Sequence, residues 1–205
     1  MRTGRPRQFD RDEAVRQAMH LFWQYGYEST SLAQLKAAMG RGITAPSFYA
    51  AFGSKEALFG EAVSRYLTTH ARVTDSLWDS TLPPREAIER ALMRSARMQC
   101  EPDHPQGCMV ALGVMSASSP EYRHVLKPLT DSRRRTREGL RHCVEKGISS
   151  GELREEAGTR ALAVIFDSFL LGISTLSRDG VPLADIEAAI AQVMTLWDAA
   201  TTISS

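Results

Sequence analysis

Apolar side chains recur at steps of three and four residues along almost the whole chain, which is the period of an amphipathic α-helix and not the alternation of a β-strand. The first such segment carries its apolar residues on one helical face: Ala14, Ala18, Leu21, Phe22 and Tyr25. Asp10 is suited to cap the start of this helix, with Glu13 at the reciprocal position three residues later. Gly26 is suited to end it, because glycine tolerates a positive φ.

Two short helices are expected next. Ser31 and Gln34 have the spacing of a capping box, and Leu32, Leu35 and Met39 form the apolar stripe behind them. The third helix is expected over Ala45–Phe52, with Thr44 as its cap and a proline in its first turn, where the missing N–H costs nothing. Three short helices joined by tight turns are typical of a helix-turn-helix, whose third helix enters the major groove of DNA.

A long fourth helix is expected from residue 55 to about residue 80, because the prolines at 83 and 84 close the segment. Further helices are expected at 85–100, 107–117, 120–149, 158–178 and 182–200, each bounded by Pro, Gly, Ser or Asp. The sequence therefore predicts an all-α fold of about nine helices. We expect a basic arm at 1–8, a helix-turn-helix domain at 9–60, and a helical effector-binding and dimerisation domain at 61–205.

Composition and charge add modest constraints. Hydrophobic residues make up 43% of the 205-residue chain, which is typical of a globular protein. Residues 1–60 carry 8 Lys and Arg against 5 Asp and Glu, whereas the remainder has a slight acidic excess, so the first third favours an anionic partner weakly. Three cysteines imply no disulfide framework. The longest apolar stretch, 161–176, contains Asp167 and is expected to be too short to span a membrane, so a cytoplasmic protein is predicted.

The residues between Phe9 and Phe59 resemble the DNA-binding domain of the tetracycline-repressor (TetR) family. The resemblance rests on four segments in order: Ala18-x-x-Leu21-Phe22, Gly26-Tyr27-x-x-Thr30-Ser31, Gly42-Ile43-Thr44-x-x-Ser47-Phe48-Tyr49-x-x-Phe52 and Ser54-Lys55-Glu56-x-Leu58-Phe59. These segments cover about a quarter of the chain, and the chain length also fits the family. The resemblance implies a homodimeric transcription regulator that binds double-stranded operator DNA.

The DNA contacts that follow are partly carried over from the family. Thr44 would cap the recognition helix and touch phosphate, Tyr49 would bind the DNA backbone, and Lys55 would reach phosphate. Base edges would face Ala45, Pro46 and Ser47, and Thr30 and Ser31 are further candidates at the second helix. The turn before the recognition helix looks two residues longer than is usual in the family, which offers Arg41 as an extra phosphate contact. Arg5 and Arg7 in the arm could follow a neighbouring minor groove.

The last two predicted helices are candidates for the dimer interface. The segment 158–178 is apolar almost all round, which requires burial on more than one side. In the TetR family the last two helices pair with their twofold mates as a four-helix bundle. The interface residues predicted on this basis are Phe166, Phe169, Leu170, Ile173, Ile186, Ile190, Val193 and Trp197. An internal core of a monomer is the alternative.

An effector pocket is expected in the C-terminal domain, where four of the eight methionines fall within 93–115. Methionine and tryptophan suit an adaptable apolar cavity, although an ordinary core explains the same residues. The candidates are Trp78, Met93, Met98, Cys108, Met109, Met115 and Asp167. Asp167 is expected either to pair across the dimer or to meet a ligand. The basic run at 133–137 is expected to be a solvated face.

Cys100, His104 and Cys108 offer ligand types that metals use, but prolines flank His104 and no fourth ligand lies at a recognisable spacing. No metal or cofactor is therefore expected. Gly107-Cys108-Met109 resembles a segment of family members that sense electrophiles through cysteine, and Arg94, Arg97 or His104 could lower the pKa of the thiol.

The sequence thus predicts a repressor of a palindromic operator that a small hydrophobic effector releases. A thiol-based repressor that uses Cys108 is the alternative. An all-helical enzyme is a remote alternative, because no catalytic motif is visible.

Overall fold

The computed structural model describes residues 10–39, 42–115, 119–155 and 158–201. Within these ranges every named element is a helix, so the predicted all-α fold is confirmed. In chain order the elements are α1 (Arg11–Ser29), α2 (Leu32–Ala38), α3 (Ala45–Phe52), α4 (Lys55–Thr68), the 3₁₀ helix η1 (His70–Trp78), α5 (Pro84–Gln99), α6 (Met109–Met115), the 3₁₀ helix η2 (Pro120–Tyr122), α7 (Lys127–Ser149), α8 (Thr159–Arg178) and α9 (Leu183–Ala199).

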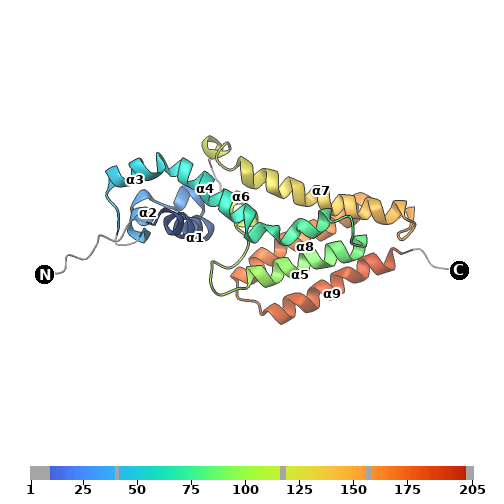
Figure 1. Ribbon diagram of the computed structural model, residues 1–205. Coiled ribbons are helices and arrows are strands. Elements are labelled where there is room, and N and C mark those ends of the chain that lie inside the picture. Colours follow the sequence, from blue (N-terminus) through green and yellow to red (C-terminus); the bar gives the residue numbers. More distant parts are fainter. Residues whose placement is uncertain (1–9, 40–41, 116–118, 156–157, 202–205) are drawn as a thin grey trace.

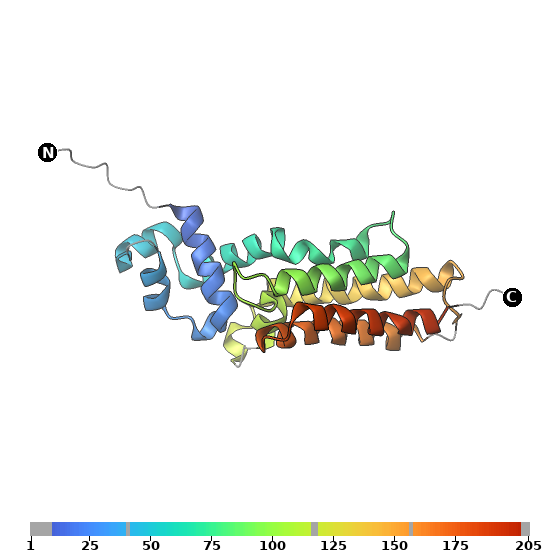
Figure 2. The ribbon, with the colours of Figure 1, turned by 90° about the horizontal axis from the view of Figure 1, so that it is seen from below.

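The helices form two groups along an elongated molecule. α1, α2 and α3 gather at one end, and α5, α7, α8 and α9 run alongside one another as a bundle towards the other end (Figures 1 and 2). α4 leads from the first group towards the second (Figure 1). The predicted recognition helix, α3, therefore lies far from the bundle, and α4 links the two groups covalently (Figure 1).

The predicted helix starts are confirmed by their caps. The Asp10 carboxylate accepts from Glu13 N at 3.1 Å, although the Glu13 side chain pairs with Arg16 instead of reaching back. Both hydrogen bonds of the Ser31–Gln34 capping box are present. The Thr44 hydroxyl accepts from the backbone of the first turn of α3. Each cap satisfies a backbone N–H that has no intrahelical partner.

The predicted break at Gly26 is present, with φ 80° and ψ 170°, although one more turn of helix follows it to Ser29. Two other predicted boundaries are wrong. The helix that begins at Lys55 ends at Thr68, because Thr69 leaves helical geometry at φ −119° and ψ −85°, and a 3₁₀ helix follows. The Thr69 hydroxyl donates to a carbonyl of the last turn at 2.7 Å, which offers the backbone an alternative partner.

The segment expected as one helix over 120–149 is also divided. Pro120 opens the short helix η2, and α7 begins only at Lys127, with a proline in its first turn. A proline lacks the N–H that a continuous helix would need, so two separate starts satisfy the backbone better.

Two hydrophobic clusters form the core. The first joins α1–α4 to residues of the α5 end, α6 and the start of α7, among them Met98, Met109 and Leu129. The second lies within the bundle and includes Phe166, Ile190 and Trp197. The first cluster therefore crosses the expected domain boundary near residue 60, and that boundary remains a prediction.

Between Arg160 and Arg178, α8 is long and apolar enough to cross a membrane by length and composition alone. The prediction that this segment is too short to span a membrane is therefore wrong, because the helix is longer than the apolar stretch on which the prediction relied. In the fold, 44% of this apolar stretch is buried inside the protomer, and Phe166 and Ile173 are fully enclosed in the second cluster. The buried residues recur along one side of α8, which is the packing of a helix with one face in a bundle.

Candidate nucleic-acid interface and ligand cavity

The outer face of α3 is polar and open. Phe48 and Phe52 are buried and hold the helix against α4, which leaves Thr44, Pro46, Ser47 and Tyr49 exposed. Ala45 is half-buried. The Thr44 hydroxyl donates to Ser47 Oγ at 3.0 Å, so the two hydroxyls sit together at the start of the helix. The predicted base- and phosphate-facing residues of α3 thus share one accessible face around a helix N-terminus, which favours anions.

Tyr49 and Lys55 differ in how freely they can reach a ligand. Tyr49 is 51% exposed, and its ring lies edge to face with Phe48. The Lys55 ammonium lies 4.4 Å from the centre of the Tyr27 ring, and burial lowers the pKa of Lys55. Such a cation–π contact holds the ammonium in place at the start of α4.

The structure removes one predicted DNA contact. Thr30 is fully buried, and its hydroxyl donates to Gly26 O at 2.7 Å, so it stabilises the break in α1 and cannot reach DNA in this conformation. Ser31 beside it is exposed and caps α2. Arg5, Arg7 and Arg41 lie outside the described residues.

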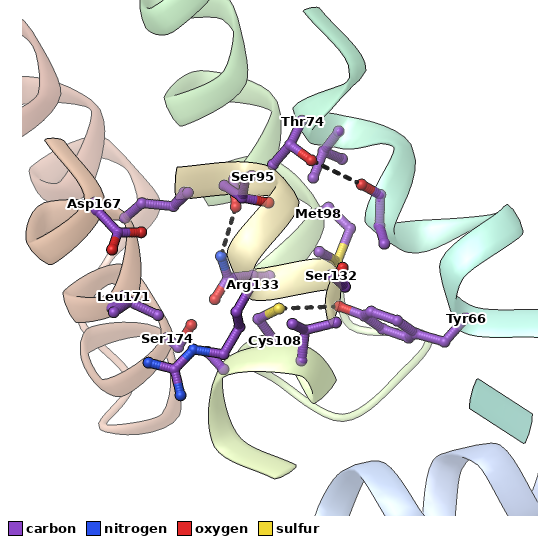
Figure 3. Close-up of a pocket in the computed structure, with 17 residues that line it drawn as sticks. Tyr66, Thr74, Ser95, Met98, Cys108, Ser132, Arg133, Asp167, Leu171 and Ser174 are labelled. Carbon is purple, nitrogen blue, oxygen red and sulfur yellow. Dashed lines mark hydrogen bonds between the residues drawn. The ribbon is translucent and has the colours of Figure 1, made fainter. Parts of the chain in front are cut away.

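A cavity lies where η1, α5, α6, α7 and α8 converge (Figure 3). Its volume, counted as the space open to the centres of water molecules, is about 50 Å³. The walls are mostly apolar, and the polar groups on them include Tyr66, Ser95, Gln99, Arg133 and Ser174. Sequence reasoning missed these five residues, because serine and glutamine at helical spacing carry no signal for a pocket.

Of the seven predicted pocket residues, Met98, Cys108 and Asp167 line this cavity (Figure 3). The other four do not line it. Met109 is buried in the first core cluster and Met93 packs against the second. Met115 is 57% exposed, and Trp78 stacks on His142 at another surface hollow.

Hydrogen bonding inside the cavity is incomplete. The Tyr66 hydroxyl donates to Cys108 Sγ at 3.3 Å and accepts from Met109 N at 3.3 Å, and burial raises the pKa of Tyr66 well above its usual range. Gln99 donates from its amide nitrogen to Ser95. Its buried amide oxygen and the buried Ser174 hydroxyl have no hydrogen-bond partner in the described structure. Buried polar atoms without partners mark a site where a ligand or water can supply them.

Asp167 is paired within its own chain. Its carboxylate accepts from Arg137 Nε at 2.8 Å, and its side chain is only 13% exposed. In the run 133–137, Arg135 and Arg137 are exposed as expected, although Arg137 also pairs with Asp167 and the Arg135 guanidinium lies 5.0 Å from the Trp78 ring centre. Arg133 departs from the prediction, because it is half-buried and lines the cavity.

Gly107, the neighbour of the cavity residue Cys108, contacts α1. Trp23 of α1 donates from Nε1 to Gly107 O at 3.0 Å, next to Cys108. Arg178 at the end of α8 donates to Trp23 O at 2.9 Å. A change of backbone position at the cavity wall would therefore act directly on α1.

Most of the predicted dimer-interface side chains belong to the protomer's own core. Five are enclosed, namely Phe166, Ile173, Ile186, Ile190 and Trp197, and Leu170 is nearly so. Only Phe169 and Val193 are partly exposed. The large apolar side chains that α8 and α9 leave exposed are Val164, Ile165, Leu176 and Leu196. The apolar pattern of α8 has two faces, and periodicity alone does not say which one faces inward.

Comparisons with known proteins agree with this architecture. Residues 14–62 match the family described as "Bacterial regulatory proteins, tetR family". The chain is 31% identical over 197 residues to the HTH-type transcriptional repressor ComR of Escherichia coli (strain K12), covering 95% of this chain and 91% of the relative. It is 34% identical over 122 residues to the repressor BdcR of the same organism, covering 60% of each chain.

A solved structure is similar over the whole fold. It is a cysteine mutant of the TetR family transcriptional regulator CifR in complex with 26-base-pair double-strand operator DNA. The two chains are 36% identical with a TM-score of 0.81, and the match covers 95% of this chain and all of that one.

Proposed function

Because the chain belongs to the TetR family of bacterial regulatory proteins, we propose that it is a homodimeric repressor that binds a palindromic operator and releases it when a small molecule occupies its cavity. It is a transcription regulator and not an enzyme. The observation that carries the proposal is the exposed polar face of α3, at the end of a fold that a relative uses while bound to operator DNA. A repressor that binds DNA would act in the cytoplasm.

The dimer is proposed to form through the exposed faces of α8 and α9. Val164, Ile165, Leu176 and Leu196 offer apolar surface to a second copy, and Phe169 and Val193 extend it. A twofold arrangement would place two α3 helices for two successive major grooves, as a palindrome requires.

The effector is proposed to be a compact, largely apolar molecule with at least one hydrogen-bond donor. Apolar walls would hold its body, while the unpartnered Gln99 Oε1 and Ser174 Oγ would accept its donor. Binding would move the wall at Cys108 and therefore Gly107, whose carbonyl holds Trp23 of α1. The shift would change the separation of the recognition helices, which lowers operator affinity.

A thiol signal is the second candidate, because Cys108 lines the cavity and receives a hydrogen bond from Tyr66. An electrophile that enters the cavity would modify the sulfur and break that contact. Operator release by a mild electrophile, lost in Cys108→Ser, would favour this signal over reversible binding.

The operator can be found by selecting DNA sequences that the purified protein binds. Gel-shift titrations then compare the wild type with Tyr49→Phe, and Tyr25→Phe is the control because Tyr25 is exposed to a similar extent, 49%, on α1. We expect Tyr49→Phe to weaken binding several-fold and Tyr25→Phe to leave it unchanged. Equal affinity of all three proteins for selected and random DNA would refute the proposal.

A further inference from the structure

The loop between α5 and α6 brings three ligand atoms together on the side of the molecule that faces α1. His104 Nε2 lies 3.4 Å from a Glu101 carboxylate oxygen and 4.0 Å from an Asp103 carboxylate oxygen. All three atoms lie within 4.8 Å of one another. Glu101 and Asp103 are exposed, whereas the His104 side chain is only 2% exposed.

The hydrogen bonding of His104 fixes which nitrogen is free. His104 Nδ1 lies 3.0 Å from Pro105 O, and a carbonyl can only accept, so Nδ1 carries the proton. In the neutral ring Nε2 then presents a lone pair, and this atom is buried without a hydrogen-bond partner among the described residues. This lone pair and the two carboxylates are three acceptors that face a common point without a donor between them. Only a cation or a proton at that point removes their repulsion.

We propose that Glu101, Asp103 and His104 form a binding site for a divalent transition-metal ion of the zinc class. Zinc binds imidazole and carboxylate at about 2.0–2.2 Å, which puts neighbouring ligand atoms of a tetrahedron about 3.4 Å apart. The 3.4 Å between His104 and Glu101 fits this spacing, and the exposed Asp103 side chain is free to close the longer gap. The remaining position is open to solvent.

The surroundings are those of an oriented metal ligand. A metal-binding histidine typically donates its other ring N–H to a carbonyl, as His104 does to Pro105. The imidazole is further held by stacking on Trp23 at 4.4 Å between ring centres. The thiols that the sequence pattern suggests as ligands are engaged elsewhere, because Cys100 contacts Ser177 at 3.6 Å and Cys108 contacts Tyr66.

This site is separate from the proposed effector cavity, so its test does not depend on operator binding. Isothermal titration calorimetry of the reduced, metal-free, full-length protein with Zn²⁺ compares the wild type with Glu101→Gln and Asp103→Asn. Both carboxylates are exposed, so these variants keep the fold. Glu145→Gln, an exposed carboxylate on α7, is the control. A Cys100→Ser/Cys108→Ser variant tests the thiols.

We expect one Zn²⁺ per chain, an affinity at least tenfold lower in each of Glu101→Gln and Asp103→Asn, and no change in the control or in the cysteine variant. Zn²⁺ is also expected to alter the tryptophan emission of the wild type and not of Trp23→Phe, because Trp23 stacks on the ligand. Absence of stoichiometric binding would overturn the proposal. So would binding that survives both carboxylate substitutions, or binding that disappears in the cysteine variant.

Discussion

The substitution Gly107→Ala is expected to destabilise the protein in two ways: through an unfavourable backbone conformation and through steric overlap of the new methyl group. Gly107 has φ +82°, a conformation that costs an L-residue about 1–2 kcal/mol. Its new Cβ would also lie 2.7 Å from Leu112 Cδ1 and 2.9 Å from Ser174 O. The leucine end can move, but the carbonyl belongs to the backbone of α8. Overpacking of this kind costs about 1–3 kcal/mol, so Gly107→Ala should lower the free energy of unfolding by about 2–5 kcal/mol in total.

Gly151→Ala is the matched control. Gly151 has φ +75°, and nothing lies within 4 Å of the position that its new methyl group would take. Both substitutions also restrict the unfolded chain to the same extent, so this contribution cancels in the comparison. The difference between the two variants therefore measures the crowding at Gly107 by Leu112 and by the backbone of α8, about 1–3 kcal/mol.

Urea unfolding followed by circular dichroism measures both variants at one fixed protein concentration, because the stability of a dimer depends on concentration. The free energy of unfolding must fall with urea concentration at the same slope in both variants, because only then does the comparison report stability. If Gly107→Ala and Gly151→Ala unfold at the same urea concentration, the packing of this loop against α8 is not as described, and the reasoning fails.

Three further predictions follow from single side chains. Tyr66→Phe should lower the free energy of unfolding by about 1–3 kcal/mol, since Met109 N would lose its buried partner; urea unfolding equal to wild type would contradict this. Cys143 should be the last cysteine to react with iodoacetamide at pH 8 in the native protein, because burial raises the pKa of its thiol to about 11; peptide mass spectrometry would contradict this if Cys143 reacted before Cys100 or Cys108. Ile165→Glu should convert the proposed dimer to a monomer in light scattering without loss of helix, and an unchanged mass would place the interface elsewhere.

The helix starts could be predicted because their signals are local. Asp10, Ser31 and Thr44 cap helices through bonds that span three residues, and these bonds formed as the spacing indicates. The break at Thr69 could not be predicted, because the following segment keeps helical spacing and contains neither glycine nor proline. There the choice between an α-helix and a 3₁₀ helix depends on packing against α5 and α7, which no local pattern encodes.

In the candidate sites, too, the sequence predicts the local features but not those that depend on tertiary packing. Periodicity identifies α8 as apolar on more than one side but does not separate Phe166, which is enclosed, from Ile165, which is exposed. Methionine enrichment points to the right region, yet only Met98 of the four lines the cavity. The pattern around His104 directs attention to the flanking cysteines, whereas the carboxylates that approach its ring belong to no recognisable motif.

The first core cluster has a consequence for the modularity of this protein. If the DNA-binding and effector-binding domains were independent modules, each could be exchanged between regulators by joining the chains near residue 60. Here Trp23 of α1 forms hydrogen bonds with Gly107 and with Arg178, and the hydrophobic cluster around Trp23 continues into α6 and α7. A cut near residue 60 would expose that shared surface on both fragments. A chimaera that keeps this fold would have to include the 100–111 segment and the end of α8 together with the DNA-binding domain. The smallest exchangeable unit is therefore larger than the helix-turn-helix.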